Sequence, residues 1–354
     1  MKSPTLPFAA MLLGGIVLGG ILLGQKWHGA HETIAPSAET EAEALERGRA
    51  ATAAHDYATS LAIYRDLMRN GSGAGTRFLG LMYMSGAGVS ADRQQACDYF
   101  DRASQEGDSA ASELLGDCFL RGDGRAVDYG QAVAFYRLAG QRGLPISYCA
   151  LGNMYLTGQG VPQDSAKAVE LCRKSANLGV ANAQTDLGQM YLTGNGVTRD
   201  FATAASWFQK ASDQGQVNAS YLLGVQYSRG DGVARDVDHA MELWRTAALG
   251  GNHPAPGALF RIYLQKSADV GYLQMSAEGT LEQLPADSSL RKSVDQTAAM
   301  KAVFWGTVAT HMEGDPAARA RILGLLNALK NLPESAGFVG EAQKFLSSRQ
   351  VPPV

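Results

Sequence analysis

The sequence of 354 residues predicts an all-α fold, a right-handed α-solenoid of helix-turn-helix repeats. The main observation is a Leu-Gly pair that recurs every 36 residues without slippage. A fixed period of this length is typical of stacked units that bury their apolar faces only against neighbours. We also expect an N-terminal transmembrane helix and a C-terminal helical cap. The five pairs begin at Leu79, Leu115, Leu151, Leu187 and Leu223.

Residues 1–26 are predicted to be a membrane anchor or a signal segment. No charge occurs from Leu6 to Leu23, and as a helix this stretch would span ~26 Å, close to the ~30 Å hydrocarbon core. Bulky or polar residues follow where signal cleavage requires small ones, which favours an uncleaved anchor. Lys2 precedes the segment and acidic residues follow it, so the body is expected outside the cytoplasm. Secretion after cleavage is the alternative.

Gly15 and Gly19 lie four residues apart, as in closely packed membrane helices, so an anchor-mediated homodimer is a further alternative. Residues 27–40 are polar and small, and we interpret them as a linker. Residues 41–75 are predicted to form an opening helical pair. Its second helix would begin after the capping residue Asp56.

The segment 76–255 is predicted to hold five repeats, each with two helices that we call helix A and helix B. A small residue lies four positions before each repeat leucine and an aromatic residue four after it, which gives helix A one apolar stripe. The glycine after the leucine suits close approach of a neighbouring helix. Two further glycines end helix A, and an aspartate then caps helix B. These aspartates are Asp92, Asp128, Asp164, Asp200 and Asp236.

This pattern, LGxxYxxGxGVxxDxxxA, closely resembles the Sel1-like repeat, a relative of the tetratricopeptide repeat. The resemblance implies a stack with an extended groove, lined by one face of helix A, for a protein partner. The chain departs from the pattern at Arg125, where valine is usual, at Cys172, where an aromatic is common, and at Leu144-Pro145. These departures indicate local adjustments within the same fold.

After residue 255 the pattern weakens. Residues 256–284 are interpreted as a degenerate sixth repeat, in which Phe260 replaces the glycine. Residues 285–354 are predicted to form the C-terminal cap, with helices near 288–313, 316–330 and 334–349. A separate functional module is the alternative for this tail.

The candidate partner-binding residues lie two and six positions after the repeat leucines. They are off the apolar stripe and vary where the frame is constant, as expected for residues that specify contacts. The prediction comprises Asp117, Arg121, Asn153, Thr157, Gln189, Thr193 and Arg229.

The sequence gives little sign of catalysis, and we predict no cofactor and no metal site. A formal charge of −3 gives no reason to expect nucleic acid as a partner. His28 and His31 are at most a weak metal pair. Ser289 and Lys292 match an SxxK motif of serine β-lactamases without its companion motifs, so a hydrolase is only the alternative from another class.

The chain has four cysteines, and Cys118 and Cys172 occupy helical positions that are apolar in sister repeats. We therefore expect buried free thiols, and a disulfide only if the body is exported. The cysteines are Cys97, Cys118, Cys149 and Cys172.

Together these features predict a non-catalytic scaffold or adaptor that binds another protein, and the expected partner is a protein of the cell envelope. We expect a single-pass protein of the bacterial inner membrane with its body in the periplasm. A periplasmic immunity protein that neutralises a secreted antibacterial effector is a sharper alternative within this class.

Overall fold

The computed structural model describes residues 39–269, 273–275, 281–283, 297–312, 316–330 and 335–348. The predicted anchor at 1–26, most of the linker, and the residues His28, His31, Ser289 and Lys292 lie outside these ranges. Within the described part of the chain, no helix is both long and apolar enough to cross a membrane. The anchor therefore stays a prediction.

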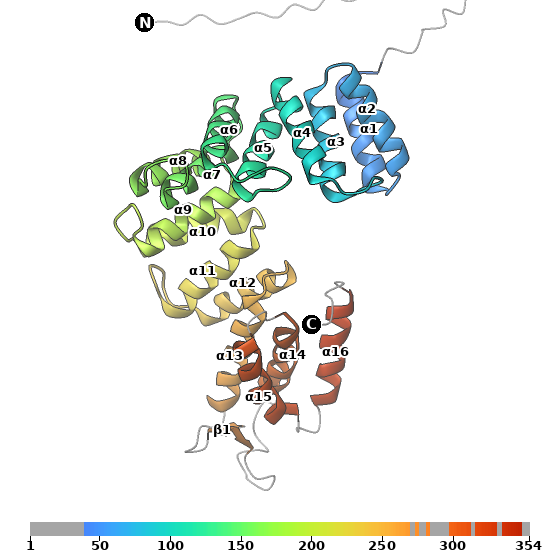
Figure 1. Cartoon of the computed structure of the whole chain (residues 1–354). Coiled ribbons are helices and arrows are strands. Elements are labelled where there is room, and N and C mark those ends of the chain that lie inside the picture. The colour runs from blue at the N-terminus through green and yellow to red at the C-terminus, as the bar shows by residue number, and fades with distance from the viewer. Residues whose placement is uncertain are drawn as a thin grey trace, which may run out of the picture. The chain divides into compact units, whose positions relative to one another are not determined.

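Antiparallel helix pairs follow one another along the chain from Glu41, and each pair packs on the next (Figure 1). The opening pair is α1 (Glu41–Ala53) and α2 (Tyr57–Arg69), and Asp56 caps α2 as predicted. Five pairs of helix A and helix B follow, as the period predicted. They are α3 (Gly73–Ser85) and α4 (Arg93–Gln105), α5 (Ser109–Arg121) and α6 (Tyr129–Gln141), α7 (Ile146–Thr157) and α8 (Ser165–Asn177), α9 (Ala181–Thr193) and α10 (Phe201–Asp213), and α11 (Val217–Arg229) and α12 (Val237–Leu249).

The ends of these helices are set by the recurring residues of the pattern. The side chain of Asp92 accepts a hydrogen bond of 2.9 Å from the backbone N–H of Gln95, and the other four repeat aspartates cap their helices in the same way. Such a bond satisfies one of the free amides at a helix start. Helix A ends in each repeat at a glycine in the left-handed conformation, Gly86 in the first.

The glycine after each repeat leucine makes room for a large side chain of helix B. A Cβ added at Gly116 would lie 2.8 Å from the ring of Tyr136, so any side chain here would force the helices apart. The prediction of close helix approach is confirmed in the other repeats as well. In the third repeat the facing atom is the sulfur of Cys172, 3.1 Å from the Cβ position of Gly152.

The second glycine of each inter-helix turn packs against the preceding repeat. A Cβ at Gly124 would lie 2.3 Å from the carbonyl carbon of Arg93, at the start of helix B one repeat earlier. The turn therefore contacts the neighbouring unit through bare backbone, which only glycine allows.

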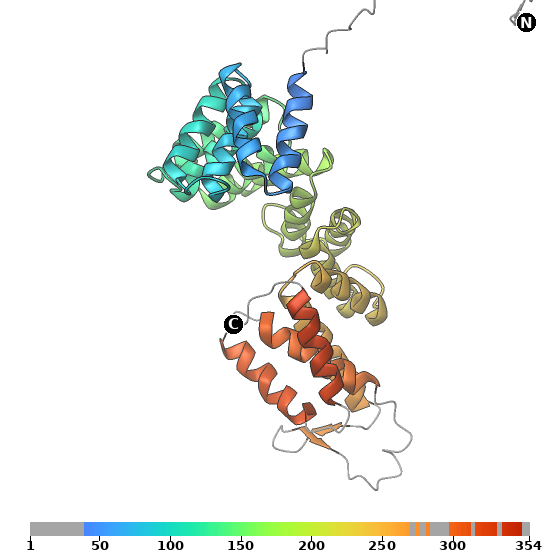
Figure 2. The same ribbon diagram turned by 90° about the vertical axis from the view of Figure 1, so that its right-hand side faces the viewer.

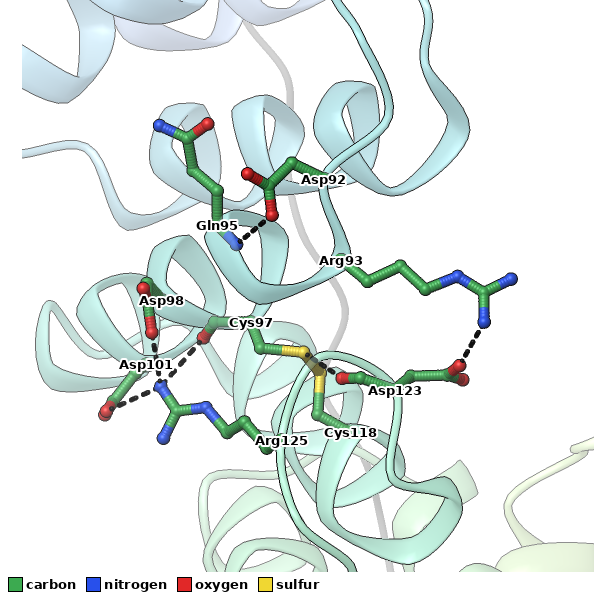
Figure 3. The surroundings of a disulfide bond; sticks show 9 residues. All are labelled: Asp92, Arg93, Gln95, Cys97, Asp98, Asp101, Cys118, Asp123 and Arg125. Atoms are coloured by element: carbon green, nitrogen blue, oxygen red, sulfur yellow. Dashed lines mark hydrogen bonds and ion pairs between the residues drawn. A yellow bond between two sulfur atoms is a disulfide. The ribbon is translucent and has the colours of Figure 1, made fainter.

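All four cysteines are paired, which makes the expectation of free thiols wrong. Cys97 on α4 bonds Cys118 on α5, across the junction of the first two repeats (Figure 3). Cys149 on α7 bonds Cys172 on α8, within the third repeat. The physical reason is that these positions face each other between packed helices.

The sequence contained a signal for the Cys97–Cys118 pair, in the residues at the equivalent positions of the next repeat. The equivalents of Cys97 and Cys118 one repeat later are Val133 and Met154, which share one buried cluster. Two cysteines at such facing apolar positions are therefore within reach of each other.

The junction of the first two repeats carries ion pairs as well as a disulfide. The guanidinium of Arg125 lies 3.0 Å from Asp98 and 3.3 Å from Asp101 on α4, and 5.3 Å from the ring of Phe119. Arg93 forms a second pair of 2.6 Å with Asp123 (Figure 3). The departure from valine at position 125 therefore ties the turn of one repeat to helix B of the previous one.

The tail differs from the prediction for residues 256–284. Helix α13 (Pro254–Asp269) takes the place of helix A, but the strands β1 (Leu273–Met275) and β2 (Leu281–Gln283) form an antiparallel pair where helix B was expected. Helix α14 (Thr297–Met312) packs against α13 instead (Figure 2). The helices α15 (Pro316–Lys330) and α16 (Ser335–Ser348) also contact α14, and a single buried cluster runs from α12 to α16.

The contact between α13 and α14 reproduces the repeat contact with its two residues exchanged. In the repeats, a glycine on helix A faces a large side chain on helix B. Here Phe260 on α13 faces Gly306 on α14, whose Cβ position lies 3.0 Å from the ring. The loss of the glycine at 260 is therefore offset by a glycine on the facing helix.

We predict that Gly124→Ala lowers the free energy of unfolding by about 2–4 kcal/mol, because the new Cβ meets backbone and the residue has a φ of +72°. Gly107→Ala is the matched control, since its φ is +98° but no atom lies within 4 Å of its Cβ position. It should cost only about 1–2 kcal/mol. Urea unfolding followed by circular dichroism measures both, and equal losses would contradict the packing account.

Replacing both Cys97 and Cys118 with serine should lower the free energy of unfolding by about 3 kcal/mol. The bridge joins residues 21 positions apart and so restricts the unfolded chain. Peptide mapping by mass spectrometry without reductant should recover the pairs Cys97–Cys118 and Cys149–Cys172. A Cys118–Cys149 peptide would show that the helices are arranged differently.

Candidate partner-binding groove

The positions two and six residues after each repeat leucine form two columns along the helix-A face, and these columns border three cavities. One, of about 360 Å³, is lined by Asp117, Arg121, Asn153 and Thr157 together with residues of α9. A second, of about 250 Å³, is lined by Asn153, Gln189 and Thr193. A third, of about 340 Å³, is lined by Leu81 and Ser85, the column residues of α3, together with residues of α1 and α2. We call this row of columns and cavities, from α3 to α9, the helix-A groove.

The structure thus brings six of the seven predicted residues together and leaves one apart. Asn153 and Asp186 line both polar cavities, so the two cavities adjoin one another between α5 and α9. Arg229 lies on α11, is exposed, and is not among the residues that line these three cavities.

The polar cavity between α5 and α9 holds a chain of side-chain contacts. The hydroxyl of Tyr136 donates a hydrogen bond of 2.5 Å to one carboxylate oxygen of Asp117, and Arg121 pairs with the other at 3.0 Å. Burial and the hydrogen bond to Asp117 raise the pKa of Tyr136 far above its ordinary value, so this residue stays a donor. Asp117 is therefore held in place from two sides.

Two further carboxyl groups line the same cavity and were not predicted. Glu113 lies one turn before Asp117 on α5, and Asp186 lies on α9. Burial, with the nearby charge of Asp117, raises the pKa of Glu113 to about 7. Burial also raises the pKa of Asp186, although a hydrogen bond from Asn153 opposes the change.

A signal for Asp186 was present in the repeat alignment. The residue directly before the repeat leucine is apolar in the four sister repeats, and only the fourth repeat has an acid there. The sister residues are Phe78, Leu114, Ala150 and Leu222. A single acid in an apolar column indicates a site.

The threonines of the second column contribute less than predicted. The hydroxyl of Thr157 donates to the backbone carbonyl of Asn153, and that of Thr193 donates to the carbonyl of Gln189, both at 2.9 Å. Because these protons are used within the helix, the side chains of Asn153 and Gln189 are the better donors toward a partner.

The described part of the chain contains no cluster of three or more potential metal ligands.

A stack of paired helices with a groove along helix A defines this protein as an α-solenoid repeat protein. The sequence profile of the Sel1 repeat matches it at residues 74–108, 109–144, 145–180, 181–216 and 217–252, which is half of the chain. The protein belongs to the Sel1 repeat family. The sequence matches none of the curated proteins with which it was compared.

Solved structures support the fold. A Sel1 repeat protein from Oxalobacter formigenes is 25% identical with a TM-score of 0.62, and the match covers 76% of this chain and all of that one. The protective antigen c5321 of uropathogenic Escherichia coli is 23% identical with a TM-score of 0.56, over 87% of this chain and 69% of that one. The immunity protein Pa5087 of Pseudomonas aeruginosa is 19% identical with a TM-score of 0.40, over 72% and 87%. That last likeness carries no functional argument.

Glu113 should make the protein less stable as pH rises. Its pKa is about 7 in the folded chain and ordinarily 4.5, so between these values the unfolded chain loses the proton first and stability falls. Allowing for partial exposure, the loss should be about 1–2 kcal/mol between pH 4.5 and pH 7. In Glu113→Gln this part of the pH dependence should vanish, as measured by urea unfolding at pH 5 and pH 8. An unchanged pH profile in the variant would contradict the assignment.

Proposed function

We propose that this protein is a non-catalytic interaction scaffold that binds a protein partner through the helix-A groove. The single observation that carries the proposal is that two adjoining polar cavities follow the variable columns of α5, α7 and α9. The residues that build the stack are buried between helices, whereas Arg121, Asn153 and Gln189 in these columns are exposed. Membership of the Sel1 repeat family supports the same kind of role.

We further propose that the body works outside the cytoplasm. Two disulfides support this location, because such bonds persist in oxidising compartments and are rare in the cytosol. The charge-free segment from Leu6 to Leu23 would then tether the body to the membrane that it has crossed. In a bacterium this places the groove in the periplasm. An immunity protein is a special case of this proposal, in which the partner is a secreted effector.

Site-specific photo-crosslinking in cells tests the groove directly. A photoreactive residue at Asn153 should give one discrete covalent adduct with a second protein, since this side chain is exposed between the two polar cavities. The same residue at Arg137, which is exposed on helix B of the second repeat, is the matched control and should give none. An adduct at Arg137 and none at Asn153 would move the binding surface to the other helices.

A further inference from the structure

The polar cavity has more acid than base. Glu113, Asp117 and Asp186 line it, and Arg121 is the one basic side chain among its lining residues. Arg121 is already paired with Asp117 at 3.0 Å. Within the described part of the chain, neither Glu113 nor Asp186 has an ion pair with a basic side chain. When Glu113 and Asp186 ionise, the cavity therefore carries negative charge without a matching cation in its lining.

Apolar side chains line the same cavity together with the charged ones. Leu120, Ile146, Ala150 and Met154 line it, and Ile146 is an exposed large apolar residue of the solenoid, 36% accessible. An arginine or lysine side chain has this same division, because its alkyl stem packs on apolar surface while its head stays polar. A cavity of about 360 Å³ has room for one such side chain.

The cavity of the helix-A groove at α1–α3 has a different character. The cavity of about 340 Å³ at α1, α2 and α3 is lined largely by Tyr64, Phe78, Leu81 and Met82. The rings of Tyr64 and Phe78 are stacked with their centroids 5.0 Å apart, so the cavity has an aromatic lining. An aromatic or aliphatic side chain fits such a site.

The spacing between the two cavities sets the length of the segment that can fill both. Helix α3 contacts α5 along the groove, and packed helix axes lie about 8–10 Å apart. The helices α5 and α7, which line the polar cavity, lie one and two such steps from α3, which lines the other cavity. These distances of about 8–20 Å equal about three to six residues of extended chain at about 3.3 Å per residue.

We propose that the partner of the helix-A groove is an extended protein segment that places an arginine or lysine beside Glu113 and Asp186. The same segment places an aromatic or aliphatic residue in the cavity of α1–α3, about three to six positions away. This inference rests on the proposed function and specifies the chemistry of the partner. Charge complementarity selects the basic residue, and the stacked rings select the apolar one.

The titration of the cavity supports this assignment. A bound cation would stabilise the ionised form of Glu113, whose pKa of about 7 reflects burial and the charge of Asp117. Binding should therefore release a proton and strengthen as pH rises from 6 to 8. The other titratable groups in the cavity are Asp117, Arg121, Tyr136 and Asp186.

Selection from a peptide library tests the proposal with a defined probe. Random twelve-residue peptides displayed on phage are panned against the purified full chain, and enriched peptides are measured by fluorescence polarisation. We expect a basic residue and an apolar residue at the stated spacing. Replacing the arginine of a selected peptide by citrulline, which keeps the shape and removes the charge, should weaken binding about tenfold or more.

Matched variants assign each half of the peptide to its cavity. Glu113→Gln with Asp186→Asn should remove the loss caused by citrulline, whereas Glu170→Gln with Asp213→Asn makes the same charge change at exposed positions of helix B and should leave it intact. Leu81→Gln should weaken binding through the apolar residue, and Leu178→Gln, at an exposed apolar position, should not.

Two outcomes overturn the proposal. One is enrichment of peptides without a basic residue, or no enrichment at all. The other is a citrulline effect that persists in the variant with Glu113 and Asp186 changed. Crosslinking at Asn153 together with either outcome would retain the groove as the binding surface and reject only the basic partner. No adduct at Asn153 would reject the proposed function itself.

Discussion

The rest of the structure depends on one contact, a position without a side chain on helix A against a large side chain on helix B. Gly116 against Tyr136 is typical, and the close approach fixes how the two helices of a repeat meet. Where the sequence departs from this rule the contact is kept by other means. Cys172 fills the space over Gly152 and is bonded to Cys149, and Phe260 packs on Gly306 with the two roles exchanged.

This packing determines which residues are left for recognition. The leucine stripe and the glycines face neighbouring helices, so the columns two and six positions after the leucine remain along the groove. The disulfides lie close to this surface. Cys149 lines the polar cavity, and the Cys97–Cys118 bond joins the first repeat to the second. A disulfide and the ion pairs of Arg125 therefore link the first repeat, which lines the apolar cavity, to the second, which lines the polar one.

Two carboxyl groups of the polar cavity, Glu113 and Asp186, lower the stability of the fold at neutral pH, because burial disfavours their ionised forms. Asp186 stands in a column that is apolar in the sister repeats, and burial raises its pKa. Burial, together with the charge of Asp117 one turn away on α5, raises the pKa of Glu113 and so disfavours its ionised form. Groups with such shifted pKa values gather at functional sites more than elsewhere, because a structural role would favour an apolar residue.

The sequence by itself determined the repeat register, the helix ends, the aspartate caps and the columns of the groove. These features are local and periodic, so a spacing of four or of 36 residues is enough to locate them. Tertiary structure alone decided that Cys149 pairs with Cys172, that Glu113 and Asp186 share a cavity, and that strands follow α13. Each of these depends on which helices become neighbours, and each occurs only once in the described part of the chain, so no repeating spacing marks it.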